Sequence, residues 1–227
     1  MFDKKSILII APHPDDEAIC CGGLIMQAKK QNAKIFVLFM AIGYSRQFLT
    51  GSTNSTTRIK EIKKAAKMGN YSWSIAFKGK PFMRLDSLPQ KDIIEKIEDI
   101  AQKVKPDIVC IPQRDSFDQD HRAVSQACIT AFRPLPSDLK HQPTVVLEAE
   151  EPYTWSTSSA NTPINFYVDV SDCFQEKITL LACHKTQLRE DPFPRSPQNL
   201  ERLAGIRGCD VGKKYAEGYR LLRSVIL

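Results

Sequence analysis

The chain has 227 residues, of which 42% are hydrophobic and 26% charged, and a formal net charge of +6. This length and composition favour a single domain spanning residues 1–227, with enough apolar side chains for a sizeable core. The charge is mild, and no block of five or more like charges occurs. Nucleic acid is therefore disfavoured as a partner, since nucleic-acid-binding proteins usually concentrate basic residues on one face, whereas an anionic small substrate is compatible with this charge.

Seven cysteines are scattered along the chain without a C-x-x-C pair. Their distribution argues against a disulfide framework and a structural zinc knuckle, and it predicts free, mostly buried thiols. The first apolar run is too short for a signal peptide or a membrane span. We therefore expect a cytoplasmic protein without a membrane-spanning segment, and nothing in the sequence excludes self-association.

Predicted strands and helices alternate in the first two thirds of the chain. Apolar runs at residues 7–10, 34–40 and 108–111 are typical of buried parallel strands, and a shorter strand is predicted at 73–77. Helical spacing begins near Pro14 and is present over residues 58–68, 88–104 and 122–132. This alternation predicts an α/β fold, a Rossmann-like three-layer sandwich in which a mostly parallel sheet has helices on both faces.

The remaining segments are less regular. Strands are predicted at residues 144–148 and 164–170, a helix at 172–184, and two short helices at 198–207 and 213–222. The polar stretch 45–57 is long for a connection inside a compact domain. It is a candidate lid over the strand ends, although segments of this composition are also often disordered.

Two polar loops follow predicted strand ends. The first, residues 11–17, contains one histidine and three acidic residues, and the second, residues 113–121, ends in Asp120 and His121. Because right-handed crossovers bring the carboxyl ends of parallel strands to the same edge of a sheet, we expect the two loops to meet there.

These loops contain candidate metal ligands. His13 and Asp16 lie three residues apart at a predicted helix start, and His121 follows another strand. Two imidazoles and one carboxylate, with coordination positions left for water, are typical of a catalytic zinc site. Asp15 is then available as the base that takes the proton of the activated water. Spacing alone leaves a second interpretation open, in which the acidic residues complement the helix dipole at about 0.3–1 kcal/mol each and His13 is a hydrogen-bonded loop residue.

Residues 12–17, Pro-His-Pro-Asp-Asp-Glu, resemble the signature of the LmbE-like, or PIG-L, family of zinc-dependent de-N-acetylases. The resemblance covers most of the chain, and other segments that are similar to family patterns are Arg58-x-x-Glu61, Asp86, Gln119-Asp120-His121-Arg122, His184-x-x-Gln187, and residues 203–208 and 215–217. It implies Zn²⁺ bound by His13, Asp16 and His121, with Asp15 as general base. The implied activity is removal of the acetyl group from a small N-acetylated amino sugar or its conjugate.

One position departs from the family pattern. Many members have histidine three residues before the third ligand, where it assists the oxyanion or the leaving amine, and this chain has Asp118. An anionic carboxylate would repel an oxyanion. Either Asp118 is held neutral as an acid, or His184 or a substrate group supplies the proton, or the activity is altered. Alternatively, Asp118 is a turn residue that accepts backbone N–H groups, and His184 is a polar residue at a helix end.

Two arginines are candidate substrate-binding residues. Arg58 and Arg114 are expected near the cleft, and a guanidinium is suited to holding an anionic group such as phosphate through two hydrogen bonds. For Arg58 the alternative is a solvated helix residue or an ion pair with Glu61.

Two further functions stay open at this point. Asp118 in place of the family histidine is compatible with a metal- or nucleotide-binding α/β module that does not hydrolyse its ligand. Catalysis by Cys183 beside His184, or by Cys20 and Cys21, is disfavoured because adjacency in sequence is not the geometry that a Cys–His pair needs.

Overall fold

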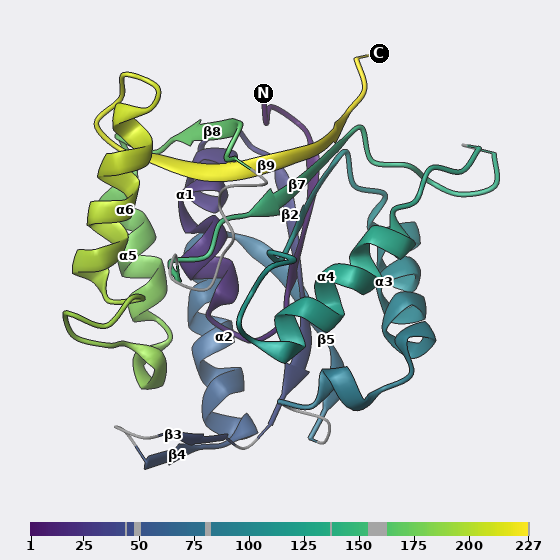
Figure 1. The fold of residues 1–227 in the computed structure, drawn as a ribbon, viewed down its shortest axis with the longest axis horizontal. Helices are drawn as coiled ribbons and strands as arrows, with labels where there is room; N and C mark the ends of the chain where they lie inside the picture. The colour runs from purple at the N-terminus through teal and green to yellow at the C-terminus, as the bar shows by residue number, and fades with distance from the viewer. Residues whose placement is uncertain (44, 48–50, 80–82, 137, 154–162, 227) are drawn as a thin grey trace.

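The computed structural model describes residues 1–43, 45–47, 51–79, 83–136, 138–153 and 163–226 (Figure 1). Its main sheet has seven strands in the order β5-β2-β1-β6-β7-β9-β8. The five strands from β5 to β7 are parallel, and β9 runs antiparallel to both β7 and β8. The strands are β1 (Ser6–Ala11), β2 (Lys34–Ile42), β5 (Tyr71–Lys78), β6 (Ile108–Ile111), β7 (Val145–Ala149), β8 (Phe166–Asp169) and β9 (Ala216–Ser224). The predicted mostly parallel sheet is confirmed.

Helices cover both faces of this sheet (Figure 1). One layer contains α1 (Asp16–Lys30), α2 (Ser55–Gly69), α5 (Phe174–Ala182) and α6 (Pro197–Cys209). The opposite layer contains α3 (Gln90–Val104), α4 (Gln119–Ala131) and the short 3₁₀ helix η1 (Leu85–Ser87). The predicted three-layer α/β sandwich is therefore confirmed.

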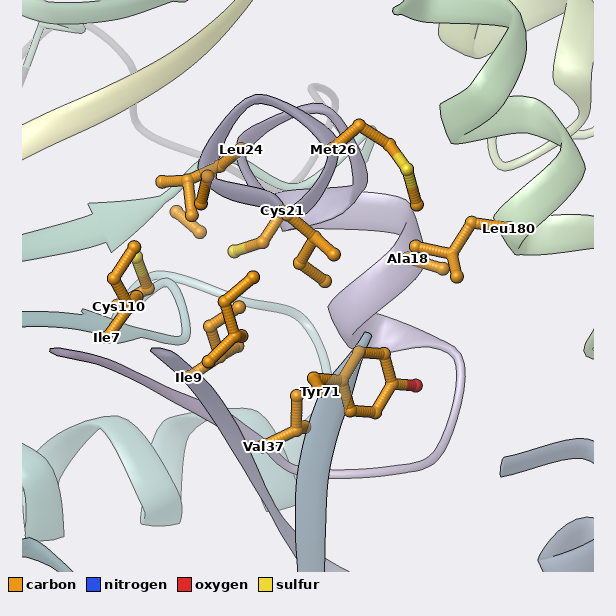
Figure 2. Close-up of a cluster of buried hydrophobic side chains, with 14 of the residues drawn as sticks. Ile7, Ile9, Ala18, Cys21, Leu24, Met26, Val37, Tyr71, Cys110 and Leu180 are labelled. Atoms are coloured by element: carbon orange, nitrogen blue, oxygen red, sulfur yellow. The ribbon is translucent and has the colours of Figure 1, made fainter. Parts of the chain in front are cut away.

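The two layers bury two separate hydrophobic clusters. Along β1, Ile7 and Ile9 face the α1 side, whereas Leu8 and Ile10 face the α3–α4 side, and all four are at most 3% exposed. Figure 2 shows the first cluster, with Cys21 and other side chains of α1 lying over Ile9 of β1. Because both faces of the central strands are buried, their sequences are continuous apolar runs rather than alternating patterns.

The prediction of a helix at residues 213–222 is wrong, because β9 occupies this segment. Tyr219 and Leu221 belong to the cluster on the α1 side and Leu222 to the cluster on the α3–α4 side. Side chains alternate in this way along a strand. A segment this short has an ambiguous period, and pairing with β7 and β8 decides its conformation.

The polar stretch 45–57 contains an antiparallel hairpin and the start of α2. The hairpin consists of β3 (Ser45–Gln47) and β4 (Gly51–Thr53), while residues 48–50 lie outside the described residues. Helix α2 begins at Ser55, earlier than predicted, since the Asn54 side chain accepts the backbone N–H of Thr57. The lid hypothesis stays a prediction.

No helix in the described part of the chain is long and apolar enough to cross a membrane.

Candidate active site

The two polar loops meet at the carboxyl ends of the adjacent parallel strands β1 and β6. Asp16 is the first residue of α1, and His121 lies in the first turn of α4. One possible ligand atom from each of His13, Asp16 and His121 lies within 4.8 Å of the other two. The structure thus brings the three predicted metal ligands together.

Two of the distances between these donor atoms are close to those around a bound metal ion. The Oδ2 atom of Asp16 is 3.7 Å from Nδ1 of His13 and 3.2 Å from Nε2 of His121. Ligands about 2 Å from a tetrahedral zinc ion lie roughly 3.3 Å from one another. The side chains of Asp16 and the two histidines are only 9–15% exposed, so the site is largely shielded from solvent.

Each histidine uses its second ring nitrogen to contact a buried carboxylate. Nε2 of His13 lies 2.9 Å from Asp120 Oδ2, and Nδ1 of His121 lies 2.6 Å from Glu151 Oε1. Such contacts fix the orientation of a metal-binding imidazole and raise its basicity. They leave Nδ1 of His13 and Nε2 of His121 on the side of Asp16. The donor set therefore fits a divalent metal ion.

The electrostatics of this cluster favour a bound cation. Burial disfavours the charged form of His121, yet the carboxylates of Asp16 and Glu151 raise the pKa of His121 well above its ordinary value. Burial likewise disfavours ionisation of Asp16, but the imidazoles of His121 and His13 hold the pKa of Asp16 below its usual range. Asp16 therefore stays a carboxylate and can act as an anionic ligand.

We expect Glu151→Gln to weaken zinc binding by about 10–100-fold, because the His121 ring loses its anionic hydrogen-bond partner. Competition with a chromogenic chelator measures this affinity. Glu150→Gln is the matched control, since Glu150 pairs with Arg207 and should leave zinc affinity unchanged. Equal zinc affinity for Glu151→Gln and the unmodified protein would contradict the assigned role of Glu151.

Asp15 is buried beside the ligands and has an unusual backbone conformation, with φ of 113°. Its Oδ1 accepts a hydrogen bond from Arg58 at 3.0 Å and its Oδ2 accepts one from Arg195 at 2.7 Å. Its backbone N–H donates to Glu17 Oε2 at 2.9 Å. Burial raises the pKa of Asp15, and the two guanidinium groups oppose this shift. A carboxylate in such a place can accept a proton.

Arg58 points inward. Besides Asp15 it donates to Glu61 at 2.9 Å, and its side chain is 4% exposed. The predicted alternative, an ion pair with Glu61, is thus present together with a contact to Asp15. Its predicted contact with a substrate anion stays a prediction.

His184 contacts Glu17 through a different carboxylate oxygen from the one that accepts the Asp15 backbone N–H. Its Nε2 is 2.7 Å from Glu17 Oε1, and both side chains are fully buried. Glu17 also accepts a hydrogen bond from the Tyr71 hydroxyl at 2.9 Å. Although burial opposes both shifts, pairing lowers the pKa of Glu17 and raises that of His184. These contacts give His184 a structural position, and its predicted role as proton donor stays untested.

Asp118 and Arg114 lie in the loop between β6 and α4. Asp118 is the N-cap of α4, and its Oδ1 accepts the backbone N–H of Asp120 at 2.8 Å. Arg114 has a side chain that is 44% exposed, with Nε 3.1 Å from Glu148 Oε2. Asp118 thus makes the contact expected of a turn residue that accepts a backbone N–H. Arg114 retains exposed surface for a ligand.

The cysteine hypothesis finds no support in the described geometry. The Cys183 thiol donates to the Thr179 carbonyl at 3.6 Å, while the His184 ring contacts Glu17. Burial raises the pKa of Cys20 and of Cys183, which disfavours the nucleophilic thiolate.

Three residues of the site were not predicted from the sequence as site residues: Asp120, Glu151 and Arg195. Asp120 is adjacent to His121, and Glu151 follows β7, a third strand that ends at the same edge. An acidic residue at that position is a signal that could have indicated Glu151. No local spacing connects Arg195 with Asp15, because 180 residues separate them.

Comparison with known proteins gives the family. The profile of the PIG-L family, described as GlcNAc-PI de-N-acetylase, matches residues 8–132, more than half of the chain. The chain belongs to the PIG-L family. The predicted resemblance is confirmed, and the matched region contains all three candidate ligands, Asp15 and Arg58.

Two curated relatives of this PIG-L protein are named as deacetylases. A diacetylchitobiose deacetylase of Thermococcus kodakarensis is 26% identical, over 99% of this chain and 86% of the relative. A probable N-acetyl-alpha-D-glucosaminyl L-malate deacetylase 2 of Bacillus cereus is 24% identical, over 81% of this chain and 84% of the relative. Both relatives are matched over most of their length.

A solved structure with the same fold has a different named activity. The 4-carboxy-2-hydroxymuconate hydratase of Pseudomonas putida superposes with a TM-score of 0.74 at 18% identity and covers 98% of both chains. This likeness shows the fold alone. A shared fold does not determine the reaction, which depends on the residues of the site.

Proposed function

We propose that this PIG-L family protein is a zinc-dependent hydrolase that removes the acetyl group from an N-acetylated amino sugar or its conjugate. The observation that supports this most is the convergence of His13, Asp16 and His121 beside the buried carboxylate of Asp15. The names of the two relatives point to the same reaction.

His13, Asp16 and His121 would hold the zinc ion. Zinc bound there supplies Lewis-acid chemistry, lowering the pKa of water and polarising a carbonyl oxygen. Two nitrogens and one carboxylate oxygen are donors that zinc accepts, and three protein ligands leave a position for water or substrate.

Asp15 would take the proton of the attacking water. Burial raises its pKa, which favours uptake of a proton, and the guanidinium groups of Arg58 and Arg195 oppose this shift. The leaving amine then needs a proton. Since the Asp118 carboxylate is occupied as the cap of α4, Asp15 is the acid that we assign to this second transfer as well.

Variants of Asp118 test this assignment. Asp118→Asn should keep kcat within about threefold, because asparagine is as good an N-cap as aspartate, whereas Asp118→Ala should lose about 1 kcal/mol of unfolding free energy. Steady-state kinetics and denaturant unfolding measure the two effects. A loss of kcat of about 10²-fold or more in Asp118→Asn would instead identify Asp118 as the general acid.

The substrate would be a small N-acetyl amino sugar, and an anionic conjugate is favoured by Arg114, which is partly exposed in the loop before α4. N,N'-diacetylchitobiose and an N-acetylglucosaminide bearing a carboxylate are suitable test compounds. The zinc-loaded protein should release a primary amine from at least one of them, and a chelator should abolish the release. Binding without amine release across such a panel would favour the non-hydrolytic module.

A further inference from the structure

Arg195 connects a loop near the carboxyl end of the chain to the proposed base. Its Nη1 lies 2.7 Å from Asp15 Oδ2, and Arg58 donates to Asp15 Oδ1 at 3.0 Å. Each carboxylate oxygen of Asp15 is therefore bound by a different guanidinium group. A carboxylate has about four lone-pair sites. Both oxygens thus keep capacity to accept a proton.

The backbone at Asp15 needs such external contacts. Its φ of 113° and ψ of −27° lie outside the regions that residues with a Cβ atom favour. A strained conformation persists only where the surroundings hold it, at a cost of order 1–3 kcal/mol. Here the backbone N–H of Asp15 donates to Glu17, and the carboxylate is held by the two arginines.

The loop that presents Arg195 is itself fixed at several points. Asp191 accepts two hydrogen bonds from Arg202, at 2.5 and 3.0 Å. The Pro194 carbonyl accepts a hydrogen bond from the Asn199 side chain at 2.5 Å. The guanidinium carbon of Arg195 lies 5.8 Å from the centre of the Phe193 ring. The Asn199 contact and this ring hold the residues next to Arg195, whereas the Asp191–Arg202 pair is exposed and contributes little to its position.

We propose that Arg195 is a positioning residue, which together with Arg58 fixes the carboxylate of Asp15 for proton transfer. The inference rests on the proposed function, because it takes Asp15 as the base. Arg195 acts through Asp15, and no direct contact with substrate is assigned to it. A misplacement of about 1 Å in a catalytic group costs up to about 10²-fold in rate.

Kinetics of Arg195→Ala test the proposal. We expect kcat to fall by about 10–100-fold, with zinc content retained and KM changed less than about threefold. Guanidinium chloride at non-denaturing concentration should restore part of kcat, whereas methylammonium chloride at equal ionic strength should not, because it lacks the planar fork of donors. A purely structural role would not produce this selective rescue.

Arg202→Gln is the matched control. It removes an arginine–carboxylate pair from the same loop, but both partners are exposed and do not touch Asp15. Such a surface pair contributes only about 0–1 kcal/mol, so kcat should stay within about threefold. Equal losses of kcat in the two variants, or absence of guanidinium rescue in Arg195→Ala, would overturn the positioning role.

A measurement independent of turnover separates this inference from the proposed function. In a double-mutant cycle of thermal unfolding, Arg195→Gln should lower Tm clearly less in an Asp15→Ala background than in the unmodified protein. Additive changes in Tm would overturn the contact between Asp15 and Arg195. Absence of deacetylation by the unmodified protein would overturn the proposed function and, with it, the positioning role of Arg195 in catalysis. The double-mutant cycle would still show whether Arg195 holds Asp15.

Discussion

Replacing Asp15 with asparagine is expected to lower kcat by about 10²–10⁴-fold while the zinc content stays unchanged. The amide cannot accept the proton of the attacking water, yet it retains the size of the side chain and an oxygen for one of the two arginines. Asparagine also tolerates positive φ better than most residues, which limits any effect on the backbone at this position. Steady-state kinetics and metal analysis of the same preparation measure both quantities.

Comparison with Asp16→Asn distinguishes the role of the general base from that of a metal ligand. Asp16 faces His121 at 3.2 Å, so its loss should remove zinc as well as activity. Asp15→Asn should remove activity alone. Turnover of Asp15→Asn within about tenfold of the unmodified protein would contradict the assignment of Asp15 as general base.

Replacing His184 with alanine is expected to lower the free energy of unfolding by about 3–5 kcal/mol, because it leaves the Glu17 carboxylate buried without its charged partner. Tyr71 and the Asp15 backbone would still donate to Glu17, but neither carries a charge. For a chain of this size the loss corresponds to a fall in Tm of roughly 6–20 °C. Denaturant and thermal unfolding measure the change.

Glu17→Gln in the His184→Ala background is the control for this effect. It removes the uncompensated charge, so part of the lost stability should return. His141→Ala is a second control, since the His141 ring is part-buried and hydrogen-bonds to the Pro106 carbonyl rather than to a buried carboxylate, and the loss of stability should be much smaller. A destabilisation of His184→Ala below about 1 kcal/mol would show that the buried Glu17–His184 pair contributes little to the stability of the fold.

Much of the fold was predictable because its central strands are buried on both faces. The runs in β1, β2 and β6 are continuous and apolar, and their bounds differ from the predictions by two residues or fewer. Strand β9 was not predictable in this way, since only its first half is fully buried and its short apolar pattern fits a helix equally well. Its pairing with β7 and β8, both distant in sequence, determines its conformation.

In the candidate site, too, the residues within local motifs were predictable, whereas those brought in by distant segments were not. His13, Asp16 and His121 lie in two short motifs at strand ends, so local sequence and the parallel topology together predict their convergence. Glu151 and Arg195 contact His121 and Asp15 across 30 and 180 residues, respectively. These contacts depend on how β7 and the loop before α6 pack against the first two loops, which no spacing within a motif indicates.

Reaction in ¹⁸O-labelled water tests the central claim most directly. The zinc-loaded protein, with N,N'-diacetylchitobiose or another N-acetylglucosaminide of the panel, should release equal amounts of primary amine and acetate, with one labelled oxygen in each acetate molecule. Chelation of the metal should stop the release of both products. Absence of acetate across the panel, or transfer of the acetyl group to an acceptor other than water, would contradict the proposed hydrolysis.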